Sequence, residues 1–188
     1  AMSMTYSFRN RRARGQTSAE LYRRLIARSA LLYVFGIFFH GGFSVPLSEV
    51  RFTRIFHRLA VAILFSGLIE LTFTVRRQIA LLVLVLVGYW GLMAFVAAPG
   101  YESGDYSPQG NFSEYVDKVL LGARTYFVLS TIGVVGTCIL GLLVGHVLQL
   151  PRTAGEKAVA LAVAGMVLVN LGFGWDVLCP VNRHLWTP

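Results

Sequence analysis

The chain has 188 residues, of which 55% are hydrophobic and only 14% are charged, and its mean hydropathy is +0.62. A soluble domain of this length has no use for so much apolar surface, so the composition excludes a soluble enzyme and favours several membrane spans. The formal net charge of +8 would also fit a nucleic-acid-binding protein. Most arginines, however, lie in short segments between apolar runs, as the positive-inside rule expects, and nucleic acid is therefore not an expected partner.

Five apolar runs are long enough to predict transmembrane helices. They cover residues 27–43, 55–73, 79–97, 128–148 and 158–175. Arginine-rich segments alternate with an acidic outer loop at 98–126, so we expect the N-terminal end in the cytoplasm and the C-terminal end outside. The periodicity of residues 113–121 predicts a short amphipathic helix on the outer surface. The expected fold class is an all-α, polytopic transmembrane helix bundle, forming one domain over residues 1–188 in the lipid bilayer.

Small residues inside two of these runs predict close contacts between helices. Gly88 and Gly91 lie in the third predicted span, and Gly141 and Gly145 lie in the fourth at the spacing of a packing face. We expect these glycines to serve helix packing rather than ligand binding.

The cysteines and histidines do not form the pattern of a metal site or of a disulfide framework. Cys138 and Cys179 are far apart, and neither lies in a Cys-x-x-Cys motif. The four histidines are scattered, and none pairs at the i, i+4 spacing of a helical metal site. No metal cofactor is expected.

The second predicted span begins with arginines and carries an acid, Glu70, inside its apolar run. On a helix the arginines share one stripe, which contains Arg51, Arg54 and Arg58. His57 lies next to that stripe. Such groups are costly in a bilayer and usually line a cavity or an anion path. The alternative is that the arginines extend to lipid headgroups and that no cavity exists.

Further polar residues should gather on the outer side, from the loop and from the C-terminal segment. They are Glu114, Asp117, Asp176, Asn182, Arg183, His184 and Trp186. Guanidinium forks bind anions, and carboxylates, amides and an aromatic face complete a mixture that suits a sugar or a phosphorylated ligand. A solvated outer surface with an aromatic belt is the alternative that periodicity leaves open.

Four segments form an ordered set of motifs. They are VRFTRIFHRLAVAILFSGLIELTF at 50–73, GNFSEYVDKVLLG at 110–122, LSTI at 129–132 with LGLLVG at 140–145, and PVNRHLWT at 180–187. They resemble the R-I-x-x-V-L-Q-R-(I/L), N-x-x-x-Y-(I/V)-D-(R/K)-x-x-L-G, L-(S/G)-T-(I/L)…L-G-x-x-(A/V)-G and P-(I/V)-N-K-x-L-W-(S/T) segments of one family. This is the heparan-α-glucosaminide N-acetyltransferase family of membrane acyltransferases.

The chain also departs from the pattern of that family. His57 stands where the family usually has Gln, Arg183 stands where it usually has Lys, and residues 125–127 lack the usual Asp-Pro-Glu-Gly. The catalytic histidine of the family lies in an outer loop that would precede Ala1, so no histidine of this chain is expected to take that role. We therefore expect an internal fragment of a larger enzyme, inactive by itself.

The resemblance implies that the full protein moves acetyl groups from cytoplasmic acetyl-CoA to an amino sugar or other glycan outside. The expected location is a bacterial inner membrane, because the loops are short and no lysosomal N-terminal domain is visible. The expected ligand-binding residues are Arg54, His57, Arg58, Asp117, Asn182, Arg183 and Trp186. Two alternatives stay open: a non-enzymatic carrier of anionic or glycan substrates, and a scaffold with lipid-facing arginines. A homo-oligomer is also left open.

Overall fold

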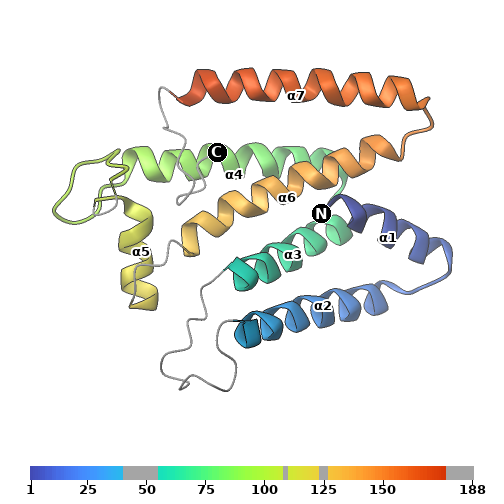
Figure 1. Cartoon of the computed structure of the whole chain (residues 1–188), viewed down its shortest axis with the longest axis horizontal. Helices are drawn as coiled ribbons and strands as arrows, with labels where there is room; N and C mark the ends of the chain where they lie inside the picture. Colours follow the sequence, from blue (N-terminus) through green and yellow to red (C-terminus); the bar gives the residue numbers. More distant parts are fainter. Residues whose placement is uncertain (40–54, 108–109, 123–126, 177–188) are drawn as a thin grey trace.

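The computed structural model describes residues 1–39, 55–107, 110–122 and 127–176, which form helices and no strand (Figure 1). The helices are α1 (Met2–Ala13), α2 (Ser18–Phe39), α3 (Ile55–Thr72), α4 (Val75–Phe95), α5 (Phe112–Leu121), α6 (Val128–Leu148) and α7 (Ala154–Asp176). The all-α class is thus confirmed, and so is the short helix in the loop.

Within the described residues, four helices are long and apolar enough to cross a membrane, namely α3, α4, α6 and α7. They cover four of the five predicted spans, and the polytopic helical architecture is therefore confirmed. The remaining predicted span, 27–43, falls on α2, which has arginines in its first half and is described only as far as Phe39.

Two of the membrane helices begin about one turn before the predicted apolar runs. Helix α4 starts at Val75, directly after Thr74, so that Arg76 and Arg77 belong to the helix instead of a turn. Helix α7 starts with a capping box, in which Thr153 Oγ1 accepts from the Glu156 N–H and Glu156 Oε2 accepts from the Thr153 N–H. Side-chain capping fixes the start of α7, and helix propensity, rather than hydropathy, extends α4 beyond its apolar run.

Helix α6 lies at the centre of the bundle and packs against α1, α3, α4 and α5 (Figure 1). One core cluster joins α3, α4 and α6 through buried residues that include Leu82, Ile139 and Leu142. A second cluster joins α4 to α6, and partly buried residues of α5 pack against it. We call the side of the bundle next to α5 the α5 end and the side next to α1 the α1 end.

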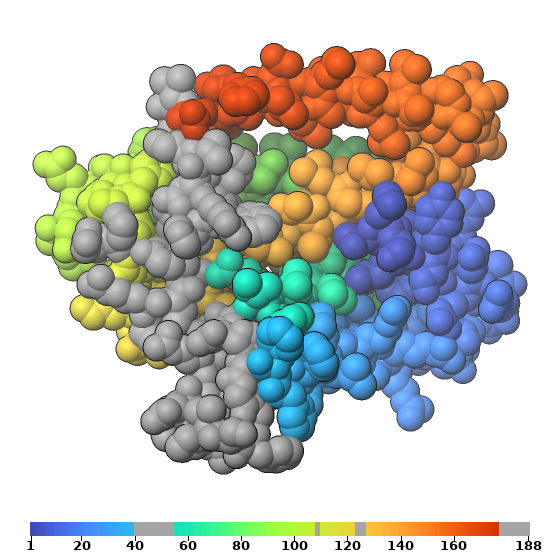
Figure 2. Space-filling model, viewed as in Figure 1, coloured from blue at the N-terminus to red at the C-terminus, as the bar shows by residue number. Residues whose placement is uncertain are grey.

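Helix α7 lies along one edge of the molecule, as Figure 2 shows at the top of the view. None of its side chains is buried by the described part of the chain. It is tied on at two places: Lys157 Nζ donates to the Leu148 carbonyl oxygen at 2.9 Å, and the rings of Trp90 and Trp175 lie 5.4 Å apart. Its exposed apolar surface suits a helix surrounded by lipid.

The glycines of α6 confirm the predicted packing face. A Cβ atom on Gly145 would overlap Thr5 Oγ1 and lie 3.0 Å from the Met2 carbonyl oxygen, so α1 can lie on α6 only because this position has no side chain. Gly141 contacts the start of α1 in the same way. The expectation for Gly88 and Gly91 is wrong within the described residues, because a Cβ atom at either position would meet nothing within 4 Å.

Replacing Gly145 by Ala is therefore expected to lower the free energy of unfolding by about 1–3 kcal/mol, because the new methyl group forces α1 away from α6. Gly91→Ala is the matched control, since it adds the same group where there is space. Thermal unfolding in detergent, followed by circular dichroism, measures both. Equal stability of the two variants would contradict the close α1–α6 contact.

Candidate functional site

Both ends of α5 are set by residues of the second motif. Asn111 is the N-cap: its Oδ1 accepts from the Glu114 N–H at 2.8 Å, while its Nδ2 donates to the Ser107 carbonyl oxygen at 2.6 Å. The helix ends at Gly122, whose φ of +66° is the left-handed conformation that glycine adopts without strain. These caps fix the register in which α5 presents its side chains.

The acidic face of α5 points into the protein. Glu114 and Asp117 are 3% and 0% exposed, whereas Val119 and Leu120 on the opposite side are more than half exposed. A solvated outer surface is therefore the wrong interpretation for these two acids. An acid that is buried at the edge of a membrane bundle needs a partner.

Asp117 finds such partners at the N-terminus of α6. Its Oδ2 accepts from the backbone N–H of Phe127, and its Oδ1 accepts from the N–H of Val128 at 2.9 Å. The first N–H groups of a helix have no acceptor within the helix, and a carboxylate there also interacts favourably with the helix dipole. Asp117 therefore connects α5 to the central helix.

Arg58 of α3 is half-buried and lies within electrostatic range of this carboxylate. Tyr89, which is buried on α4, lies within the same range of the guanidinium group. The guanidinium carbon of Arg58 lies 5.9 Å from the centre of the Phe127 ring, within the range of a cation–π contact. Arg58, Tyr89, Asp117 and Phe127 form what we call the Arg58–Asp117 site, to which four elements contribute.

An apolar cavity of about 350 Å³ adjoins this site between α3 and α6. Phe65 of α3 and Thr131 of α6 are among the residues that line it, and Phe127 belongs to both the cavity and the Arg58–Asp117 site. A ligand could therefore place an apolar portion in the cavity and an anionic or hydroxyl portion near Arg58. The guanidinium group is suited to phosphate, carboxylate and sugar oxygens.

His57 points to a different neighbour, although it precedes Arg58 in the sequence. Its ring is fully buried against α2, where it meets the Tyr33 ring edge-on at a centroid distance of 4.4 Å. Gly36 gives it space there, because a Cβ atom on Gly36 would lie 3.2 Å from the imidazole Cε1. Consecutive helical residues are about 100° apart around the axis, so one of them faces α2 while the other faces α6.

The other predicted binding residues lie outside the part of the chain that the structure describes. They are Arg54, Asn182, Arg183 and Trp186. The structure thus brings together Arg58 and Asp117, assigns His57 to the α2–α3 contact, and does not describe the rest.

A second polar group, at the α1 end, was missed by the sequence analysis. His146 Nε2 on α6 lies 3.0 Å from Glu70 Oε2 on α3, and Gln78 Nε2 on α4 donates to the same carboxylate oxygen at 3.0 Å. The available signal was that Glu70 and His146 both lie near the C-terminal ends of apolar runs that cross the membrane in the same direction. Such residues fall at the same depth.

Polar groups therefore lie at both ends of the interface between α3, α4 and α6. Between the Arg58–Asp117 site and the Glu70–His146 pair, Ser66 and Thr131 are also buried and donate to carbonyl oxygens of their own helices. Ionisable residues inside a membrane bundle often mark the path of a substrate or an ion. As for metal ligands, the described ranges hold no cluster of three or more His, Cys, Asp or Glu side chains.

Comparison with known proteins adds no relative: no family model matches the chain, and no curated protein matches it. The resemblance to membrane acyltransferases therefore rests on the four motifs.

The capping role of Asp117 can be tested by substitution. Asp117→Ala is expected to lower the free energy of unfolding by about 1–3 kcal/mol, because two backbone N–H groups lose their acceptor. Asp117→Asn retains one acceptor oxygen and should lose less. Glu102→Ala is the control, since this acid is exposed in the same loop. Chemical unfolding in detergent compares the three variants, and a loss for Glu102→Ala as large as that for Asp117→Ala would contradict the assignment.

Proposed function

We propose that the chain is part of an integral-membrane acyltransferase, which moves an acetyl group from cytoplasmic acetyl-CoA to an amino sugar or other glycan on the outer side. At the N-terminus of α6, the Phe127 ring centre lies 5.9 Å from the Arg58 guanidinium carbon, and the Phe127 N–H donates to the Asp117 carboxylate. The observation that carries the proposal is this meeting of Arg58 and Asp117. These residues are far apart in the sequence and belong to different motifs of the family that the chain resembles. The third motif contributes Thr131 to the adjoining cavity.

The residues of the site have distinct tasks in this proposal. Arg58 binds an anionic or hydroxyl group of donor or acceptor, and Asp117 holds the guanidinium in place from α5. The apolar cavity beside Phe127 gives the transferred group an apolar surface to lie against. Acetyl-CoA, when bound, supplies the acetyl thioester, whose C–S bond breaks as the bond to the acceptor nitrogen or oxygen forms, leaving coenzyme A as the thiol.

The charges of the helix ends support an orientation with the α1 end in the cytoplasm. Arginines dominate α1, the first half of α2 and the start of α4, while the loop before α5 carries Glu102 and Asp105. By the positive-inside rule, the Arg58–Asp117 site then lies in the outer half of the membrane. A bacterial inner membrane is the location that we propose.

A carrier of anionic or glycan substrates is the second candidate. It is favoured by the Glu70–His146 pair, because polar groups then occur at both ends of one interface between α3, α4 and α6. A carrier would move its substrate through this interface unchanged, whereas a transferase leaves acetyl groups on an acceptor.

Both candidates are tested with the product of the native gene, reconstituted in vesicles and supplied with radiolabelled acetyl-CoA and glucosamine. The proposal predicts labelled acetyl on the sugar, and it predicts that Arg58→Ala lowers the rate roughly 10- to 100-fold while Arg58→Lys loses less. Arg76→Ala is the control, because this arginine is exposed at the α1 end.

Acetyl transfer that is unchanged in the Arg58→Ala variant would contradict the role of the site. Glucosamine that crosses the membrane unmodified, with no acetylated product, would instead support the carrier. Neither transfer nor transport would reject both candidates.

A further inference from the structure

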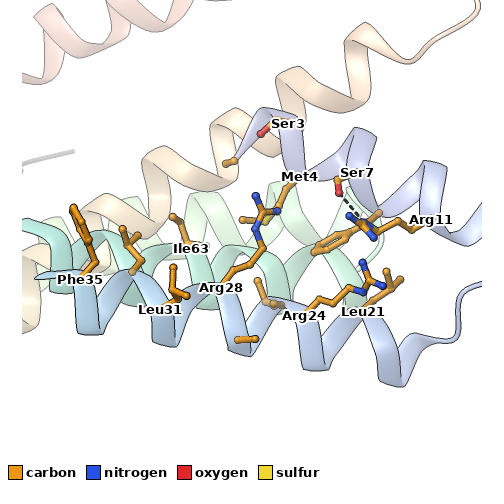
Figure 3. Close-up of a pocket in the computed structure, with 15 residues that line it drawn as sticks. Ser3, Met4, Ser7, Arg11, Leu21, Arg24, Arg28, Leu31, Phe35 and Ile63 are labelled. Atoms are coloured by element: carbon orange, nitrogen blue, oxygen red, sulfur yellow. Dashed lines mark hydrogen bonds between the residues drawn. The ribbon is translucent and has the colours of Figure 1, made fainter.

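A cavity of about 820 Å³ lies between α1 and α2 at the α1 end, away from the Arg58–Asp117 site (Figure 3). Ile63 of α3 contributes to its lining, and the walls come from α1 and α2. Its volume is in the range of known ligand pockets, roughly 300–1,000 Å³. The proposed function does not use this cavity.

One part of the cavity is strongly cationic. Arg11 of α1 and both Arg24 and Arg28 of α2 line it. Arg11 is oriented by Ser7 Oγ and Gln16 Oε1, which accept from its guanidinium at 3.2 Å and 3.4 Å. The residues that the structure describes around the cavity include no carboxylate, and no ion pair neutralises these three arginines within the described ranges.

The other part of the cavity is apolar. Along α2, Leu31 and Phe35 continue the helical stripe that begins with Arg24 and Arg28, and Figure 3 shows them beside Ile63. Leu31 is 74% exposed and Phe35 is 51% exposed, so the apolar part opens sideways toward the surroundings of the bundle. Because α2 packs against α3, a helix long and apolar enough to cross a membrane, a bilayer around α3 would place lipid acyl chains at this opening.

We propose that this cavity binds one anionic phospholipid. The phosphate lies at Arg24 and Arg28, where guanidinium forks can donate two hydrogen bonds to phosphate oxygens. An acyl chain lies along Leu31 and Phe35. The order of charge and then apolar surface along α2 matches the order of headgroup and chain in a lipid, and basic pockets between membrane helices are known to hold anionic headgroups. A soluble phosphate compound needs the arginines but not the exposed apolar stripe.

The proposal is tested by native mass spectrometry of the detergent-purified full-length protein, mixed with equal amounts of phosphatidylglycerol and phosphatidylcholine of identical chains. We expect one retained phosphatidylglycerol and at least a tenfold preference over phosphatidylcholine. Arg24→Gln and Arg28→Gln should each weaken retention about fivefold, as expected for the loss of one arginine at a membrane surface. The control Arg76→Gln/Arg77→Gln removes exposed arginines at the same end and should retain the lipid.

A second variant separates the cavity from surface charge. Ala27→Trp fills the cavity from α2, leaves all arginines in place, and should also release the lipid. If an arginine variant fails to fold, Ala27→Trp still tests whether the lipid binds in this cavity. Retention that survives Ala27→Trp, or that falls equally in the control, would overturn the proposal.

A parallel mixture with coenzyme A in place of the lipids distinguishes the two sources of phosphate. Coenzyme A that binds and is lost with Arg24→Gln, while phosphatidylglycerol shows no preference, would overturn the lipid assignment. Such a result would mean that the ligand of the cavity is a soluble phosphate compound.

Discussion

Asp117 satisfies two electrostatic demands that the bundle could not otherwise meet in an apolar environment. The N-terminus of α6 presents backbone N–H groups without an acceptor, and Arg58 brings a positive charge to the start of α3. The buried Asp117 carboxylate accepts from these N–H groups and attracts the Arg58 guanidinium. It lies near both because Asn111 and Gly122 fix the ends of α5. The contact between α5 and the start of α6 therefore depends on one side chain.

The opposite end is held by different chemistry. Glu70 accepts from Gln78 and pairs with His146, which joins α3, α4 and α6 a second time. Between the two ends, Leu82, Ile139 and Leu142 provide apolar packing. In a bilayer, apolar contacts between helices gain little over contacts with lipid, so polar ties and close packing at small residues carry much of the specificity. Gly145 provides such close packing for α1.

The sequence was sufficient to predict five of the helices that the structure describes, but not the contacts between them. Apolar runs of membrane length predicted α3, α4, α6 and α7, and the pattern at residues 113–121 predicted α5, because length and periodicity are local properties. The sequence predicted that Arg58 and Asp117 lie on the same side of the membrane, but it did not predict that the two residues meet. His57 shows that sequence position does not reveal which helix a side chain contacts. It is adjacent to Arg58 in the sequence, yet its ring faces α2.

The remaining features depend on how helices cross. The sequence does not distinguish Gly145, which packs against α1, from Gly91, where an added Cβ atom would meet nothing within 4 Å among the described residues. Likewise, the positive-inside pattern places Arg24 and Arg28 only in a cytoplasmic segment, and the position of α1 across α2 makes them part of the wall of a cavity. Close packing at a glycine and the formation of a cavity both depend on the distance between two helices. A local sequence pattern does not predict that distance.

A double-mutant cycle between Arg58 and Asp117 tests the central interaction most directly. The free energy of unfolding in detergent is measured for the native protein, Arg58→Gln, Asp117→Asn and the double variant. The structure predicts a coupling of about 0.5–3 kcal/mol, because each substitution removes the partner of the other. Effects that simply add, with a coupling well below about 0.5 kcal/mol, would show that the two charges do not interact.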